Sequence, residues 1–170
     1  AEGLEKLSSV NTIVFDKTGT ITKGKPEVTD VVVLDRQFSE EELIQYASSV
    51  EKLSEHPLAQ AIAEKAAQRN ITLIHAGNFT ALEGIGVQAT VDAKKIYIHK
   101  PDPGIEHPQI KSLQEQGKTV VVVEINQRLT GLIALSDTIK EEARTVIDHL
   151  HRKNIQVIML TGDNYLAANT

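Results

Sequence analysis

A short apolar run that ends on an aspartate and passes straight into a turn constrains this chain most. Residues 13–24 read IVFDKTGTITKG, so Asp16 follows three apolar residues and precedes Lys-Thr-Gly. An apolar run with β-branched residues and polar flanks is typical of a buried strand. We therefore predict a buried strand over residues 11–16. A solvated turn would explain Asp16 and Gly19, but it would not explain the whole string.

The C-terminal part of the chain has a related pattern. Residues 138–154 predict an amphipathic helix with Ala143, Ile147 and Leu150 on its inner face, and residues 155–164 predict a buried strand that ends in a Thr-Gly-Asp turn. Continuous apolar strands that alternate with helices are typical of a parallel sheet covered by helices. Both ends of the chain therefore predict one doubly wound α/β unit.

The middle of the chain predicts an antiparallel sheet with helices. The expected elements are a small hairpin or flap (18–26), strands (27–35 and 77–100), helices (39–54, 56–70 and 107–118) and a hairpin around Asn-Gln (119–135). The simplest organisation is an inserted domain over residues 26–131, which interrupts a domain formed by residues 1–25 and 132–170. Such insertions are tolerated at exposed loops.

The composition argues against several kinds of function. The 170 residues include no cysteine, so the chain has neither a disulfide nor a thiolate metal site. A net charge of −5 argues against a nucleic-acid binder, which normally carries a basic stripe. No apolar run approaches the roughly 20 residues that cross a bilayer, and the N-terminus lacks the regions of a signal peptide. We expect the chain by itself to be soluble.

The position of Asp16 predicts nucleophilic chemistry. In open α/β sheets, ligands bind outside the carboxyl ends of the strands, and Asp16 and Thr161 end two predicted strands that would reach the same edge. A carboxylate there can attack phosphorus and form an aspartyl-phosphate. Lys17 and the backbone amides of Thr18 and Gly19 could offset charge on the transferring group.

Further polar residues at this edge indicate phosphate and magnesium binding. Thr161 could hydrogen-bond a phosphoryl oxygen, and Gly162 would allow close approach. Mg²⁺ binds carboxylates together with phosphate oxygens and water, so Asp16 and Thr18 are its candidate ligands. Asp163 could lie beside the Mg²⁺ ion or the phosphate, or it could simply cap a following helix.

The residue at position 18 indicates whether an aspartyl-phosphate at Asp16 would be hydrolysed quickly, as in a phosphatase, or would persist. A fast phosphatase needs an acid/base side chain near its nucleophile, and such help is typically worth about 10² to 10⁴ in rate. The natural place is two residues after the nucleophile, where this chain has Thr18. A threonine transfers protons poorly, so we expect the acyl phosphate to persist.

Two stretches in the middle of the chain are candidate nucleotide-binding segments. Glu51, Ser54 and His56 lie around a predicted helix–helix junction, and a helix N-terminus favours an anion. A capping or surface role by itself explains His56 better. Gly84 and Gly86 would let the backbone approach a ligand closely, although a bulge or a turn is the simpler explanation.

Three motifs resemble one family. DKTGTIT from Asp16, together with TGDN at residues 161–164, is similar to the P-type ATPases, ion pumps related to the haloacid dehalogenases. SEHPLA at residues 54–59 is similar to their heavy-metal branch, of which the copper exporters are the best-known members. The resemblance covers essentially the whole chain. It implies an α/β fold in which a partial haloacid-dehalogenase-like doubly wound domain carries an inserted α+β nucleotide-binding domain.

The resemblance also implies a mechanism and partners. ATP would bind with Mg²⁺, its adenine held by Glu51 and His56 while Gly84 and Gly86 pass close to the nucleotide. Asp16 would become the aspartyl-phosphate that drives export of a heavy-metal cation, Cu⁺ in the copper type. The partners would be the pump's membrane helices and actuator domain, and this truncated cytoplasmic piece would be inactive alone. A haloacid-dehalogenase-type phosphatase and a non-catalytic nucleotide-binding module are the alternatives.

Two positions need separate comment. Where heavy-metal pumps usually carry Gly-Asn, this chain has His99 and Lys100, so the usual asparagine contact is missing. A charge at a loop tip is usually solvated, and Lys100 is therefore not counted as a ligand. Asp137 resembles a hinge-region acid near the phosphorylation site, but a role as N-cap of the following helix would also explain it.

Overall fold

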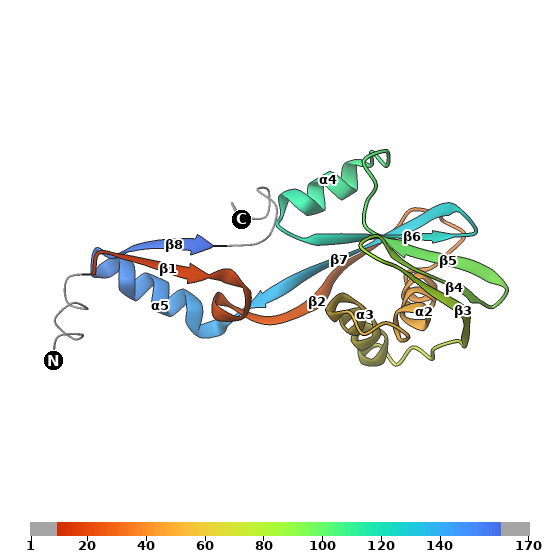
Figure 1. The fold of residues 1–170 in the computed structure, drawn as a ribbon, viewed down its shortest axis with the longest axis horizontal. Helices are drawn as coiled ribbons and strands as arrows, with labels where there is room; N and C mark the ends of the chain where they lie inside the picture. The colour runs from red at the N-terminus through yellow and green to blue at the C-terminus, as the bar shows by residue number, and fades with distance from the viewer. Residues whose placement is uncertain (1–9, 161–170) are drawn as a thin grey trace.

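The structure, a computed structural model, describes residues 10–160 and is elongated, with a small and a larger part joined by two long strands (Figure 1). In chain order the elements are β1 (Thr12–Asp16), the turn η1 (Lys17–Ile21), β2 (Thr22–Val33), α2 (Glu40–Glu51), α3 (Pro57–Gln68), β3 (Ala76–Leu82), β4 (Gly86–Val91), β5 (Lys94–His99), α4 (Pro108–Glu115), β6 (Thr119–Ile125), β7 (Arg128–Ile139), α5 (Glu141–Arg152) and β8 (Gln156–Leu160). This mixed α/β fold with an antiparallel sheet flanked by helices confirms the predicted fold class.

The small part is a parallel two-stranded sheet with one helix against it. β1 pairs with β8 so that Asp16 lies opposite Leu160, and α5 packs beside them and buries Ala143. The prediction that both strands are buried is wrong, because Val14 is 51% exposed and Leu160 is 61% exposed. Within residues 10–160, α5 covers one face of this sheet and no helix covers the other.

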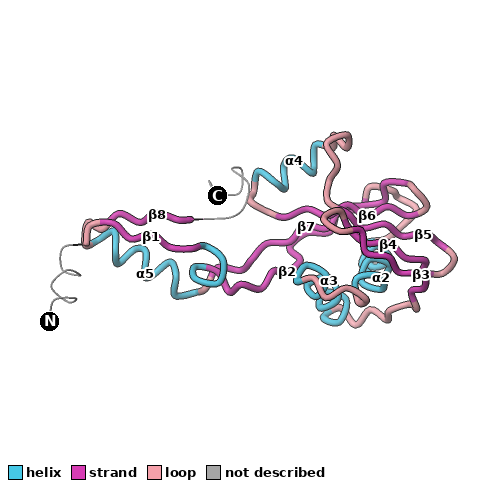
Figure 2. Tube along the Cα trace, in the orientation of Figure 1, coloured by secondary structure: helices cyan, strands magenta, loops and turns pink. Residues whose placement is uncertain are grey.

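The larger part is a six-stranded antiparallel sheet with helices on both faces. Its strand order is β2-β7-β6-β5-β4-β3, and Figure 2 shows α2 and α3 on one face and α4 on the other. The main core lies between the sheet and the α2–α3 pair, and its fully buried members include Leu43, Val50, Ile62, Ile96 and Leu135. A smaller core lies under α4 and contains Ile110, Leu113, Val122 and Leu132.

Local sequence signals explain the helix starts and the hairpin turns. The Ser39 hydroxyl accepts the Glu42 N–H while the Glu42 carboxylate accepts the Ser39 N–H, a capping box that begins α2. Asn126 and Gln127 both have positive φ, as a two-residue turn between β6 and β7 requires. The predicted helices and this hairpin are confirmed.

Both connections between the two parts run inside one antiparallel strand pair. β2 and β7 are paired from Thr22 opposite Ile139 onwards, with a register shift between Thr22 and Pro26. The predicted hairpin or flap over residues 18–26 is wrong, because the chain forms η1 and then enters β2 directly. The limits at positions 26 and 131 fall inside β2 and β7, and the proposed division into domains stays a prediction.

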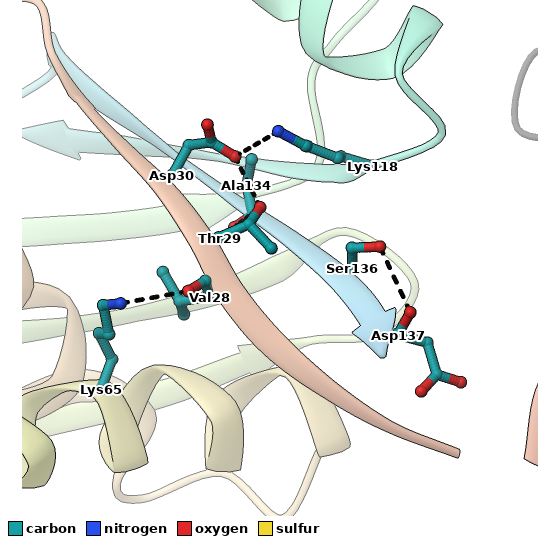
Figure 3. A network of polar contacts seen from close by, with 8 residues as sticks. All are labelled: Val28, Thr29, Asp30, Lys65, Lys118, Ala134, Ser136 and Asp137. Atoms are coloured by element: carbon teal, nitrogen blue, oxygen red, sulfur yellow. Dashed lines mark hydrogen bonds and ion pairs between the residues drawn. The ribbon is translucent and has the colours of Figure 1, made fainter. Parts of the chain in front are cut away.

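Polar contacts fasten the middle of β2 to elements on both faces of the sheet (Figure 3). The Lys118 ammonium lies 2.7 Å from Asp30 Oδ2, and the Lys65 ammonium donates to the Val28 carbonyl at 3.3 Å. Burial acts to raise the pKa of Asp30, but hydrogen bonds from Lys118 and Thr29 outweigh it, and the pKa is lowered. Because Lys65 lies on α3 and Lys118 follows α4, both helical layers hold the same strand.

We predict that Gly131→Ala destabilises the chain strongly. A Cβ at this position would lie 2.6 Å from the Val32 carbonyl oxygen and would collide with Leu43. Overpacking of this kind typically costs about 1–3 kcal/mol, which urea titration would measure as a loss of unfolding free energy. Gly77→Ala is the matched control, because a Cβ there meets nothing within 4 Å. An equal loss in both variants would contradict the packing argument.

Candidate functional site

Asp16 lies at the exposed carboxyl end of β1, where the chain turns into η1. Its Oδ1 atom accepts the Thr18 N–H at 3.2 Å, a local turn that holds the carboxylate in one orientation. Within residues 10–160 the Oδ2 atom makes no hydrogen bond. One oxygen of this carboxylate is therefore held by the backbone, and the other is accessible to an electrophile.

The buried Thr22 hydroxyl fixes the shape of this turn. It accepts the Gly19 N–H at 3.2 Å, and it lies 3.1 Å from the Lys17 carbonyl oxygen and 2.5 Å from Asp137 Oδ2. The other oxygen of Asp137 accepts the Lys25 N–H at 3.1 Å. The turn that follows the candidate nucleophile is thereby tied to β7.

These contacts revise two expectations. The alternative role of Asp137 as a helix N-cap is wrong, because Asp137 lies in β7 and the N-cap of α5 is Lys140. The Lys140 ammonium donates instead to the Gly19 carbonyl at 2.8 Å. The Thr18 and Gly19 amides, expected to face a phosphoryl group, are both engaged inside the turn. The remaining predicted residues of this edge lie outside the described residues: Thr161, Gly162 and Asp163.

One cavity gathers all five residues predicted to contact the nucleotide. It has a volume of about 240 Å³, and the five come from the α2–α3 junction and the β3–β4 turn: Glu51, Ser54, His56, Gly84 and Gly86. Much of the remaining wall is apolar, from Leu58, Ala59, Leu82, Ile85, Val87, Ile98 and Val121. An apolar pocket with a few converging polar groups is typical of small-molecule sites. As nucleotide ligands, the five residues stay a prediction.

Local backbone geometry brings these residues to the cavity. His56 is the N-cap of α3, and its Nδ1 accepts the Leu58 N–H at 3.2 Å, so the neutral ring carries its proton on Nε2. Gly84 has φ +72°, a conformation that favours glycine. Gly86 pairs with His99, and a Cβ on Gly86 would lie 2.6 Å from the His99 Cα. The cap at His56 and the turn at Gly84 are confirmed.

Glu51 is an ionisable group in a largely apolar wall. It is the last residue of α2 and is 7% exposed. Burial raises the pKa of its carboxyl from 4.5 to about 7. Near neutral pH a substantial fraction of Glu51 therefore carries a proton and can donate as well as accept a hydrogen bond.

A second, larger cavity adjoins the first and reaches the Asp16 turn. It has a volume of about 570 Å³ and is lined by residues of both parts, among them Lys17, Thr18, Gly24, Pro57, Lys118 and Asp137. Leu58 and Lys100 line both cavities, one from the start of α3 and one from the end of β5. An elongated ligand could therefore extend from Glu51 to the turn that carries Asp16.

Leu58, His99 and Lys100 also line the cavity at Glu51, and the sequence alone did not assign them to a site. Leu58 belongs to SEHPLA but carries no polar group that would have singled it out. His99 is 2% exposed and stacks on Tyr97, with ring centroids 4.2 Å apart. The only hint of these residues in the sequence was that positions 99 and 100 differ from the Gly-Asn pair that heavy-metal pumps usually carry there.

The oxygen groups beside Asp16 suit a magnesium ion that arrives with phosphate. The exposed Asp16 carboxylate and the exposed Thr18 are hard oxygen donors of the kind that Mg²⁺ prefers. Within residues 10–160 no three His, Asp or Glu side chains are grouped to hold a metal ion by themselves. Phosphate oxygens and water would have to complete the coordination, as is usual for Mg²⁺ with nucleotides.

A model of the haloacid dehalogenase-like hydrolases matches residues 10–170. The chain belongs to this family. Members of a family share a fold more reliably than a reaction, so the activity has to be argued from the site. In the part that the structure describes, no helix combines the length and the apolar character needed to span a bilayer.

Individual relatives confirm the resemblance to heavy-metal P-type ATPases. A cadmium-transporting ATPase of Staphylococcus aureus is 41% identical over 180 positions, which cover 98% of this chain and 25% of that protein. A copper-exporting P-type ATPase of Staphylococcus saprophyticus is 40% identical over 171 positions, 96% of this chain and 21% of that protein. The crystal structure of a zinc-transporting PIB-type ATPase in the E2.Pi state matches with a TM-score of 0.85 and 38% identity, over 97% of this chain and 28% of that chain. This chain thus spans about a quarter of the length of these relatives.

We predict that Glu51 makes the folded state less stable as pH rises from about 4.5 to about 7. The folded state keeps the Glu51 proton up to a pKa of about 7, whereas the unfolded state loses it near 4.5. The stability that the bound proton contributes is therefore fully present below pH 4.5, and it is lost as the pH rises through the folded-state pKa of about 7. At ~1.4 kcal/mol per pKa unit, the loss is roughly 3 kcal/mol.

Urea unfolding of wild type and of Glu51→Gln at several pH values from 5 to 8 would measure this effect. The amide of Glu51→Gln does not titrate, so its advantage over wild type should grow with pH. Glu55→Gln is the control, because Glu55 is exposed on the neighbouring loop. A pH dependence that is the same in wild type and Glu51→Gln would rule out the buried-carboxyl explanation.

Proposed function

We propose that this chain is the ATP-binding and phosphorylation region of a heavy-metal P-type ATPase. The observation that carries the proposal is the adjoining pair of cavities, which share Leu58 and Lys100 and lead from Glu51 to the Asp16 turn. ATP has the matching chemistry, with an aromatic base for the apolar pocket and a chain of phosphates for the polar cavity. The names of the relatives, all ATPases, support the same substrate.

In this proposal Glu51 and His56 hold the adenine. A protonated Glu51 accepts a hydrogen bond from the exocyclic amine and donates one to the neighbouring ring nitrogen. The His56 ring is oriented by its bond to the Leu58 N–H, which leaves Nε2–H and the ring face for the base. Gly84 and Gly86 leave space beside the sugar, and Ser54 adds a hydroxyl at the same junction.

Asp16 then receives the γ-phosphoryl group. A carboxylate oxygen of Asp16 forms a bond to the γ-phosphorus while the bond from that phosphorus to the bridging oxygen breaks, and ADP leaves with the electron pair. Lys17 and Thr18 stabilise the charge on the transferring group. Mg²⁺, held by Asp16, Thr18 and phosphate oxygens, would neutralise part of that charge when bound.

The residue two positions after the nucleophile favours a pump over a phosphatase. Thr18 is exposed, and its hydroxyl is a poor general base. Water is therefore not activated at once, and the aspartyl-phosphate lives long enough to act as a conformational signal. A free-standing phosphatase of the same family would need an acid/base group at this place.

We further propose that the whole protein exports a soft metal cation. The relatives transport cadmium, copper and zinc, and copper, the ion named from the sequence, is one of these three chemically related cargoes. Membrane helices would select the ion, an actuator domain would remove the phosphoryl group, and the present chain would be the cytoplasmic part that couples ATP to both.

His56→Asn should weaken ATP binding without unfolding α3. Asparagine is a good N-cap, so the variant keeps the helix start and loses the ring. Loss of one or two contacts to the base should cost on the order of 1–3 kcal/mol of binding free energy, as titration calorimetry would show. His107→Asn is a matched control, because His107 caps α4 in the same way, with Nδ1 accepting the Gln109 N–H at 3.3 Å, outside the cavity. Unchanged ATP affinity in His56→Asn would refute the adenine role.

Asp16→Asn should abolish phosphoenzyme in the full-length pump and leave nucleotide binding unchanged. The amide oxygen of asparagine is a weak nucleophile of nearly the same shape, so the site is preserved and the reaction is not. Radiolabelled ATP with acid quenching and hydroxylamine treatment would detect an acyl phosphate. Label retained in Asp16→Asn would contradict the proposed nucleophile, and absence of label in wild type would favour the non-catalytic module.

A further inference from the structure

Lys100 lies where the two cavities meet. It follows β5 directly, it is exposed, and with Leu58 it lines both the pocket at Glu51 and the larger cavity at the Asp16 turn. A ligand that occupies both cavities would therefore lie beside both residues. Leu58 is apolar and Lys100 carries a positive charge, so an anionic group of the ligand is favoured at this place.

The backbone of Lys100 is held on both sides. Its N–H donates to the Ile85 carbonyl at 3.0 Å. Its carbonyl oxygen lies 2.7 Å from His99 Nδ1, and because a carbonyl only accepts, Nδ1 is the donor. The His99 side chain is 1% exposed and stacks on Tyr97. An exposed lysine at the end of a strand is thus fixed at its base by a buried imidazole.

The ammonium group of Lys100 differs from that of Lys118, which also lines the larger cavity. Lys118 is paired with Asp30 at 2.7 Å. For Lys100, no hydrogen bond or ion pair of the ammonium group occurs in residues 10–160. The fixed backbone sets where the ammonium group can reach, and its uncompensated charge makes it available to an anion at this place.

Taking the proposed ATP binding as given, we propose that Lys100 binds the phosphate chain of the nucleotide and makes the site selective for nucleoside polyphosphates over nucleosides. The base end of the ligand lies in the Glu51 pocket, and the reacting end lies near Asp16, so the phosphates between them pass Lys100. The N-terminus of α3, whose residues Pro57 and Leu58 line the same cavity, adds a favourable dipole for the same anion. Lys100 is therefore a specificity-determining residue, and His99 positions it.

Titration calorimetry of the chain with ATP, ADP, AMP and adenosine tests this inference. Lys100→Met should weaken ATP binding roughly tenfold, the usual effect of one charged hydrogen bond, and should leave adenosine binding within twofold of wild type. The salt dependence of ATP binding should also decrease. Lys111→Met removes an equal charge from the exposed face of α4, outside both cavities, and should change neither ligand.

Lys100→Arg supplies the second test, because it keeps the charge and should retain most of the ATP affinity. Equal weakening of ATP and adenosine in Lys100→Met, or no weakening of either, would overturn the role of Lys100 while leaving the proposed nucleotide site intact. If wild type binds neither ATP nor adenosine, the proposed function itself fails and the inference falls with it. The outcomes are therefore distinguishable from one set of titrations.

Discussion

The antiparallel pairing of β2 with β7 is the constraint on which the whole arrangement depends. Both crossings between the two parts are strands of one sheet, and their ladder continues from Thr22 opposite Ile139 to Val33 opposite Gly131. The parts therefore cannot swing independently, as they could on two flexible loops. Their relative motion has to bend this ribbon, and the register shift between Thr22 and Pro26, one of two in the ladder, interrupts the pairing nearest to the Asp16 turn. Asp137 lies across that irregularity, bound to both Thr22 and Lys25.

That location links domain closure to the state of the nucleophile. Thr22 bonds the Gly19 amide and Asp137 at once, so bending of the ribbon acts directly on the turn that carries Asp16 and Thr18. In the arrangement described, the two backbone amides nearest the carboxylate are satisfied inside the turn. If either amide is to contact a phosphoryl group, its bond inside the turn has to break first. Bending at Thr22 is one motion that would act on both bonds.

Much of the fold could be predicted from local sequence, and the failures have physical causes. Ser39 and Pro57 predicted helix starts, and Asn126–Gln127 predicted a hairpin, because each depends on contacts within a few residues. The burial of β1 and β8 was predicted wrongly. Apolar composition indicates that burial of a strand is favourable, but it does not show which other elements are present to bury it. A resemblance indicated that Asp137 lies near the Asp16 turn, but its bond to Thr22 could not be predicted, because the two residues are 115 positions apart in sequence. Glu51 and His56 were predicted as nucleotide contacts from the helix junction around SEHPLA and from a family resemblance, whereas the cavity that they line also depends on Gly84 and Gly86 from the β3–β4 turn.

The pair His99–Lys100 shows how a departure from a family pattern can be accommodated without loss of the pocket. Along β5, Ile98 packs in the main core and lines the cavity, while Tyr97 and His99, on the alternate positions, stack on each other. Gly86 lies directly opposite His99, and a Cβ there would collide with the β5 backbone, so glycine is required whichever side chain stands at position 99. With Nδ1 donating to the Lys100 carbonyl, Nε2 is left 3.5 Å from the Glu124 carboxylate, and in the neutral ring it carries a lone pair rather than a proton. The ring therefore holds the lysine backbone through Nδ1, while Nε2 makes no hydrogen bond within residues 10–160. If Lys100 binds the phosphate chain as proposed, a positive charge takes the place of the neutral asparagine contact that the resemblance implies at this position.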